Sequence, residues 1–222
     1  MKRDKCPCCH CTATKPTSVR LYNKANIYAE HGAQIVECVE CNTQYVDVVP
    51  DHDRFIEQYS EEYYPVQTGG EKRFKDHFPG VSLSTSCVLE VGGGRTGVRA
   101  MAHDYFDVDI SADTHWSSSM FDLFNDQDAD LCRDLNIDTI VSCDCIEHVL
   151  YPDRFFDVAH KILRPGGVLY VQIGDFLDVV RSSKRQSAHI NALTLKSLKF
   201  MTENKFKIVN ARQSAFTFER LG

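Results

Sequence analysis

The chain has 222 residues, of which 43% are hydrophobic and 25% charged. This is an ordinary globular composition, and the length fits one full domain plus a small appendage. The net charge of −6 lacks the basic excess typical of nucleic-acid binders, so nucleic acid is not expected as a partner. The charged start leads into cysteines, and no apolar run is long enough to cross a membrane. We therefore expect no signal peptide, no membrane contact and a cytoplasmic location.

The first part of the chain is expected to form a small subdomain over 1–50, followed by a connecting segment over 51–85. Patterns of alternating apolar residues predict short strands at 20–22, 34–37 and 44–49. In the connecting segment, 71–78 is expected to be a short helix that ends at the following Pro-Gly pair.

Six of the ten cysteines lie within the first 41 residues. Clustered thiols in an intracellular protein indicate metal ligands before disulfides. The pairs Cys6/Cys9 and Cys38/Cys41 both have C-x-x-C spacing, so four thiolates could bind Zn²⁺ in a closed, structural site. The pair Cys8/Cys11 has the same spacing, which leaves the register open, and His10 is a further candidate ligand. The alternative is a cluster of unligated thiols.

From residue 86 onward, strands are expected to alternate with helices. Apolar runs predict buried strands, and apolar residues at helical spacing predict two helices. The expected strands are 87–91, 105–109, 138–143 and 168–173, the helices are 152–163 and 194–204, and a terminal strand pair covers 207–210 and 215–218. This order predicts an α/β domain with a largely parallel sheet over 86–222.

A glycine-rich loop follows the first strand of this domain. Gly92, Gly94 and Gly97 give the spacing G-x-G-x-x-G, which allows a tight turn and close approach of a ligand. Asp109 ends the next strand, where its carboxylate can accept bonds from two ribose hydroxyls. The spacing matches a dinucleotide-binding loop, whereas Glu90 before the glycines favours a different nucleoside ligand.

Residues 86–222 resemble the class I S-adenosylmethionine-dependent methyltransferases. The resemblance is carried by LEVGGGRTG at 89–97, VDIS at 108–111, IDTIVSCDCIEHVLYP at 137–152, ILRPGGVLYV at 162–171 and HINALTLKSLKFMTENKFKIV at 189–209. The cysteine pairs followed by EQYSEEYYP resemble the zinc-ribbon head that a subgroup of these enzymes carries. The resemblance implies a Rossmann-like sheet of seven strands, with one antiparallel strand near its edge.

The resemblance also implies S-adenosylmethionine as cofactor and a set of residues that bind it. These are Glu90, Gly92, Gly94, Gly97, Asp109 and Glu147, with Asp128 or Asp130 as the acidic residue near adenine. The expected reaction is methylation of a small-molecule acceptor, more often at a hydroxyl of a sugar or other biosynthetic intermediate than at nitrogen or carbon.

A hydroxyl acceptor benefits from a base, and histidine is the usual one. His148 follows the strand at 138–143, and His189 lies beyond the strand at 168–173 on the expected acceptor side. For both residues a purely structural role is the alternative. Two other functions remain open: a nicotinamide-dependent oxidoreductase, and a non-catalytic module in which a zinc ribbon and a nucleoside fold bind a partner. The sequence leaves the oligomeric state open.

Overall fold

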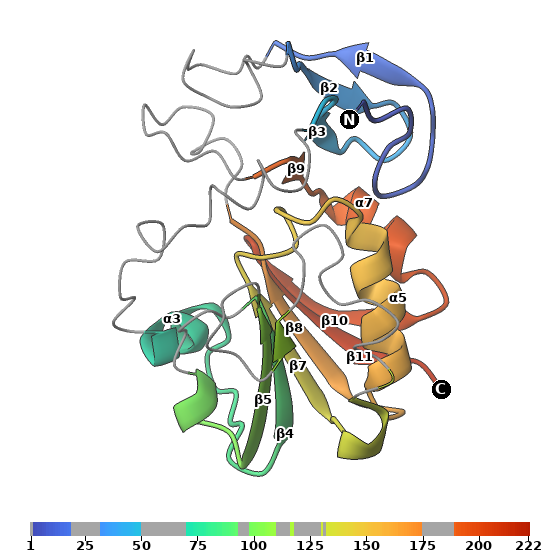
Figure 1. Cartoon of the computed structure of the whole chain (residues 1–222). Helices are drawn as coiled ribbons and strands as arrows, with labels where there is room; N and C mark the ends of the chain where they lie inside the picture. Colours follow the sequence, from blue (N-terminus) through green and yellow to red (C-terminus); the bar gives the residue numbers. More distant parts are fainter. Residues whose placement is uncertain are drawn as a thin grey trace.

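The computed structural model describes residues 2–18, 32–49, 70–92, 98–109, 116–117, 130, 132–174 and 189–222. The chain forms a large sheet flanked by helices and a second, small sheet beside the N-terminus (Figure 1). The strand expected at 20–22 lies outside the described residues. None of the helices in the described ranges has the length and apolar character that a bilayer-spanning segment needs.

The large sheet contains seven strands among the described residues, which confirms the expected number. Their order is β10 (Phe206–Arg212), β11 (Ala215–Arg220), β8 (Val168–Gln172), β7 (Thr139–Cys143), β4 (Cys87–Val91), β5 (Asp104–Asp109) and β6 (Trp116–Ser117). β11 runs antiparallel to both of its neighbours, and the pairs from β8 to β6 are parallel. The single antiparallel strand is therefore next to the edge, as expected. The two-residue β6 was not predicted.

Helices cover both faces of this sheet. On one face lie α5 (Pro152–Ile162) and α7 (Leu195–Thr202), and on the other lies α3 (Gly70–His77), near the short 3₁₀ turn η2 (Val98–Ala100); a second such turn, η3 (Arg133–Leu135), precedes β7 (Figure 1). Proline in the first turn starts α5. A capping box between Thr194 and Ser197 starts α7. Glu203 is the C-cap of α7, and Asn204 follows it in the left-handed conformation with φ +62°.

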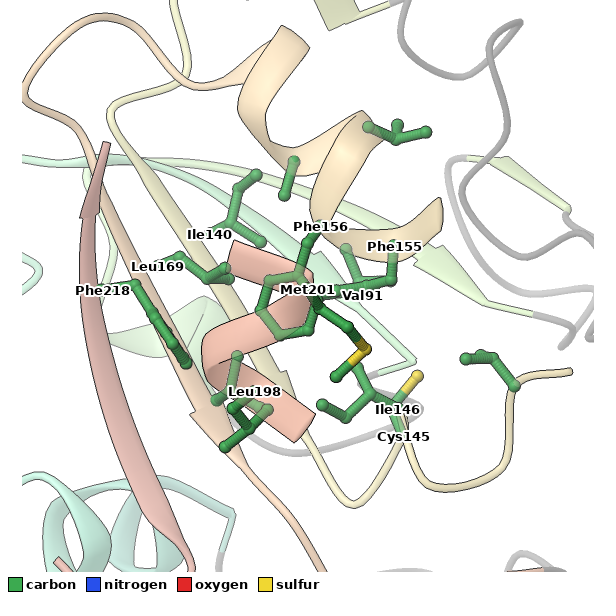
Figure 2. Packing of buried hydrophobic residues seen from close by; sticks show 14 of the residues in the cluster. Val91, Ile140, Cys145, Ile146, Phe155, Phe156, Leu169, Leu198, Met201 and Phe218 are labelled. Carbon is green, nitrogen blue, oxygen red and sulfur yellow. The ribbon is translucent and has the colours of Figure 1, made fainter. Parts of the chain in front are cut away.

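Alternating residues of each strand build two cores. On one face Leu89 belongs to a buried cluster with Ile140, Leu169, Phe156 of α5 and Met201 of α7. Figure 2 shows the last four of these residues. On the other face Val88, Val141 and Tyr170 pack with Phe74 and Phe78 around α3. Because the central strands are buried on both faces, they read as continuous apolar runs in the sequence.

The small sheet joins the N-terminal head to the large domain. It contains β1 (Thr14–Pro16), β2 (Ile35–Cys38), β3 (Gln44–Val46) and β9 (Asn191–Ala192), all antiparallel. The first three strands belong to the head, whereas β9 follows β8 in the chain and comes from the large domain. Tyr45 of β3 pairs with Asn191 of β9. The sheet of the head therefore includes a strand from the segment that begins at His189.

A buried arginine reinforces this junction. The guanidinium of Arg3 donates hydrogen bonds to the carbonyls of Leu150 (2.6 Å), Val46 (3.3 Å) and Ile190 (3.4 Å), and it lies over the ring of Tyr45. Burial lowers the pKa of Arg3 to about 10, so the group remains charged near neutral pH. A charge held by three backbone carbonyls fixes the head against both the loop after β7 and the segment before β9.

Candidate active site and candidate metal centre

The carboxyl ends of β4, β5, β7 and β8 lie along one edge of the sheet. The chain passes from β4 to β5 on one side and later enters β7 on the other, so the sheet order reverses beside β4. Ligands of open α/β sheets bind at such a point. Gly92, directly after β4, has φ +69°, and its N–H donates to Val108 O at 2.8 Å. The predicted tight turn therefore begins here, while Gly94 and Gly97 lie outside the described residues.

The space beside the Gly92 Cα is filled by the side chain of Cys145. A Cβ on Gly92 would lie 2.2 Å from Sγ of Cys145, which follows β7. Glycine at this position thus allows the ends of β4 and β7 to approach each other, a role that the sequence did not indicate.

Glu90 is buried below the turn. Its carboxylate accepts a hydrogen bond of 2.5 Å from the hydroxyl of Tyr105 on β5. Burial, followed by the nearby charge of Glu90, raises the pKa of Tyr105. Within the described residues, this carboxylate therefore connects β4 with β5. Its predicted contact with a cofactor remains a prediction.

Three predicted site residues come together after β7. Glu147 Oε1 lies 4.0 Å from His148 Nε2 and 3.8 Å from His189 Nε2, and the two imidazole rings meet edge to face with centroids 4.4 Å apart. The Glu147 side chain is fully buried, and 13% of the His189 side chain is exposed. Burial raises the pKa of Glu147 to about 7. The sequence placed these residues near one crevice but did not indicate that they touch.

Backbone hydrogen bonds explain why the two segments meet. The N–H groups of Ile190 and Asn191 both donate to Glu147 O, at 3.0 and 3.1 Å, and the Asn191 amide donates to Val149 O at 2.7 Å. Gly174, after β8, donates its N–H to Glu147 Oε1 at 2.5 Å. A Cβ on Gly174 would lie 2.6 Å from both Glu147 Oε1 and His189 Cε1. Glycine is therefore required for the close packing of this cluster.

An ion pair that the sequence did not reveal borders the cluster. Arg73 of α3 pairs with Asp144, the residue after β7, and donates to the Gln172 side chain at 3.2 Å. Asp144 has φ +46°, and its N–H donates to Gln172 O. Arg73 thus connects α3 to the ends of β7 and β8. An acidic residue directly after a buried strand was the only sequence signal for this contact.

The remaining predicted cofactor residues are only partly described. Asp109 ends β5, as expected, and its backbone pairs with Ser117 of β6, which was not expected. Its carboxylate and the whole of Asp128 lie outside the description. Asp130 is exposed. The proposed contacts of these residues with ribose and adenine remain predictions.

In the head, the sulfur atoms of Cys6, Cys9, Cys38 and Cys41 lie within 4.8 Å of one another. Cys6 and Cys41 are 3.5 Å apart, as are Cys9 and Cys38. Tetrahedral zinc with Zn–S distances of about 2.3 Å would place its sulfurs roughly 3.8 Å apart, so this donor set fits the ion. The hydrogen bond with Cys6 and burial raise the pKa of Cys41, and burial raises that of Cys9 to about 12.

The two cysteine turns have the same backbone geometry. His10 N donates to Cys6 O and Asn42 N donates to Cys38 O, both at 3.0 Å, and these two donors have φ of +59° and +61°. The N–H groups of Cys6 and Cys38 also bond to carbonyls five residues ahead, both at 2.9 Å. Cys6/Cys9 is therefore the structural counterpart of Cys38/Cys41, and Cys8 and Cys11 are not in the sulfur group.

The sheet order and the positive-φ glycine directly after β4 are those of a Rossmann-like α/β fold. Residues 67–209 match the family model described as "Methyltransferase domain" (Methyltransf_23), and the chain belongs to this family. The predicted S-adenosylmethionine-dependent methyltransferase fold and enzyme class are thus confirmed, and the oxidoreductase and non-catalytic alternatives are not favoured.

The fold is similar to that of a solved methyltransferase. A methyltransferase of Thermotoga maritima, described as S-adenosylmethionine-dependent and as a possible histamine N-methyltransferase, superposes with TM-score 0.53 at 15% identity, over 76% of this chain and 97% of that one. The N-methyltransferase NodS of Bradyrhizobium japonicum WM9, in complex with S-adenosyl-L-homocysteine, gives 0.49 at 12% identity, with the same coverage of 76% and 97%. No curated protein matches this sequence.

Proposed function

We propose that this methyltransferase transfers the methyl group of S-adenosylmethionine to a hydroxyl of a small-molecule acceptor, such as a sugar or another biosynthetic intermediate. The observation that carries the proposal is the cluster of Glu147, His148 and His189 beside the glycine turn. Cys145 contacts Gly92, so the cluster begins two residues from the turn.

The donor occupies the crevice at the carboxyl ends of β4 and β5. The turn at Gly92, Gly94 and Gly97 takes the methionine part, Asp109 binds the ribose hydroxyls, and Asp128 or Asp130 faces adenine. Glu90 and Glu147 support this crevice from β4 and from the loop after β7. The position of Asp109 at the end of the second parallel strand supports this assignment, because open α/β sheets bind nucleosides at such strand ends.

The reaction is an in-line displacement. The acceptor oxygen bonds to the methyl carbon as the carbon–sulfur bond breaks, and the sulfonium becomes a neutral thioether. Catalysis requires that oxygen, carbon and sulfur be held in line. In the metal-free protein, His148 Nε2 or His189 Nε2 is the group available to receive the hydroxyl proton. Glu147, buried between them, holds both imidazoles in place.

The head is proposed to bind one structural zinc ion through Cys6, Cys9, Cys38 and Cys41. The equal sulfur spacing and the matching backbone of the two turns support this donor set. Four protein ligands leave no open position, so the ion stabilises the head and does not take part in the chemistry.

The proposed function is tested with a methyl-labelled donor and pools of small molecules that carry hydroxyl, amine or activated carbon groups. We expect label on oxygen. The His148→Ala variant should lower turnover by about 10²–10⁴-fold with donor affinity retained. Label on nitrogen or carbon would contradict the acceptor, and thermal stabilisation by NAD but not by S-adenosylhomocysteine would contradict the donor.

A further inference from the structure

A second group of metal-binding side chains lies outside the cysteine head. The donor atoms of Glu147, His148 and His189 all lie within 4.8 Å of one another, and they come from two segments that meet after β7 and before β9. We propose that these three residues bind a divalent transition-metal ion. The inference deepens the proposed function, and its catalytic part rests on that function.

The spacing of the donor atoms is close to that of a coordination sphere. Metal–nitrogen and metal–oxygen bonds of about 2.0–2.2 Å place the ligand atoms of a tetrahedral site roughly 3.4 Å apart. The two nitrogens lie 4.0 and 3.8 Å from Glu147 Oε1, a few tenths of an ångström beyond this spacing, and all three donor atoms lie within 4.8 Å of one another. Both imidazoles present Nε2 to the same carboxylate.

The state of the carboxylate gives a second, independent argument. Glu147 is fully buried, and among the described residues its Oε2 has no hydrogen-bond partner. A buried carboxylate with a partnerless oxygen is costly, and a cation bound to the group reduces this cost by neutralising its charge. Oε1, the oxygen that faces both Nε2 atoms, also accepts the Gly174 N–H, and this hydrogen bond orients the carboxylate.

The backbone also holds the three ligands before any ion arrives. Two N–H groups of the 190–191 segment donate to Glu147 O, so the backbone next to His189 is held beside Glu147. The cluster is not sealed, because 13% of the His189 side chain remains exposed. A preformed set of three ligands with one open side leaves positions for an exchangeable ligand.

The donor set selects the class of ion. Two imidazoles with one carboxylate suit Zn²⁺, Fe²⁺ or Co²⁺, whereas Mg²⁺ prefers oxygen ligands. The exchangeable ligand is the acceptor hydroxyl. Binding to the ion lowers the pKa of that hydroxyl, and its proton passes to solvent water. The oxygen then attacks the methyl carbon as described above, so no oxidant or reductant is needed. With the ion bound, both Nε2 atoms are ligands and neither acts as base.

The binding test uses the full chain with the head already loaded with zinc, titrated with Co²⁺ and with Zn²⁺. We expect about two metal ions per chain in the wild type and in the control His103→Ala, whose imidazole is exposed on a loop before β5. His148→Ala and His189→Gln should bind the second ion at least tenfold more weakly than the wild type. The affinity of Glu147→Gln should lie between that of the wild type and that of these two variants. A wild-type chain that binds only the head ion at saturating metal would overturn the proposal, as would equal second-ion affinity in all variants. Circular dichroism and retained head zinc show that each variant is folded.

The catalytic part is tested with protein from which only the second ion has been removed by brief chelation. Methyl transfer should fall at least tenfold and recover on addition of Zn²⁺ or Co²⁺, with donor affinity unchanged. Full transfer without the second ion would refute the catalytic role and leave the proposed function intact. A second ion that binds without any hydroxyl methylation would refute the proposed acceptor and leave the metal site intact.

Discussion

The sulfur of Cys145 occupies the space into which a side chain on Gly92 would project, with an ideal Cβ only 2.2 Å away. The two residues follow β4 and β7, so this contact sets how closely the strand ends approach at the switch point. It also lies directly below the turn that is proposed to bind the donor. Donor affinity and packing at the strand ends are therefore expected to change together.

The variant Gly92→Ala should be destabilised by both backbone strain and overlap with Cys145. Gly80→Ala is a matched control, because Gly80 also has positive φ, +82°, but nothing lies within 4 Å of its Cβ position. The control should lose about 1–3 kcal/mol of unfolding free energy from strain. Gly92→Ala should lose roughly 1–3 kcal/mol more from the overlap. Urea unfolding measures both, and equal losses would show that the Cys145 contact relaxes freely.

Gly174→Ala should affect the reaction more than the fold. Its Cβ would lie 2.6 Å from both Glu147 Oε1 and His189 Cε1, so the cluster must shift to accept it. Displacements of about 1 Å at reacting groups can cost roughly 10²-fold, and we expect kcat to fall at least tenfold. Affinity for S-adenosylhomocysteine, measured by calorimetry, should stay within about threefold. An unchanged kcat would mean that the cluster plays no part in the reaction.

The Cys38→Ser variant should lose the head zinc ion, which lowers the zinc content by about one ion per chain, and destabilise the head. The large domain should keep part of its donor affinity. Cys11→Ser is the control, because Cys11 lies in the same head but outside the sulfur group. Metal analysis of protein prepared without chelator measures both variants. Zinc loss in Cys11→Ser with retention in Cys38→Ser would reverse the ligand assignment.

Asp109→Ala should weaken binding of S-adenosylhomocysteine by about tenfold or more, since two charge-assisted bonds to ribose hydroxyls would be lost at about 1.5–3 kcal/mol each. Asp104→Ala, at the exposed start of the same strand, should leave binding unchanged. Calorimetry measures the affinity of both variants for S-adenosylhomocysteine. Equal affinities would show that Asp109 does not bind the ribose.

Much of the large domain could be predicted from the sequence because its central strands are buried on both faces. The run over Thr139–Cys143 is mainly apolar and buried along its whole length, and the α5 pattern begins with a proline. The strands that were not predicted are short or polar: β1 is three exposed residues, and β6 and β9 have two residues each. Such strands exist only because a partner strand lies beside them, so they leave no periodic signal.

The sequence predicted which residues belong to the site but not which of them contact one another. Glu147, His148 and His189 were identified, yet their convergence depends on backbone bonds between segments about 40 residues apart in the chain. Arg3 was not identified, because an arginine in a charged N-terminal stretch normally faces solvent. The four cysteines were found by spacing, while the choice of Cys6/Cys9 over Cys8/Cys11 depends on which residue adopts a left-handed conformation.

The shared small sheet has a consequence for the order in which the protein can fold during synthesis. Arg3 and its acceptor Ile190 are 187 positions apart, and β3 cannot pair with β9 until residues 191–192 have left the ribosome. The cysteine turns can form early from local contacts, but the edge of β3 stays unpaired while most of the chain is made. Contacts of such long range form late and leave an open strand edge in the meantime. An early metal ion in the head would hold the first strands in register until their final partner arrives.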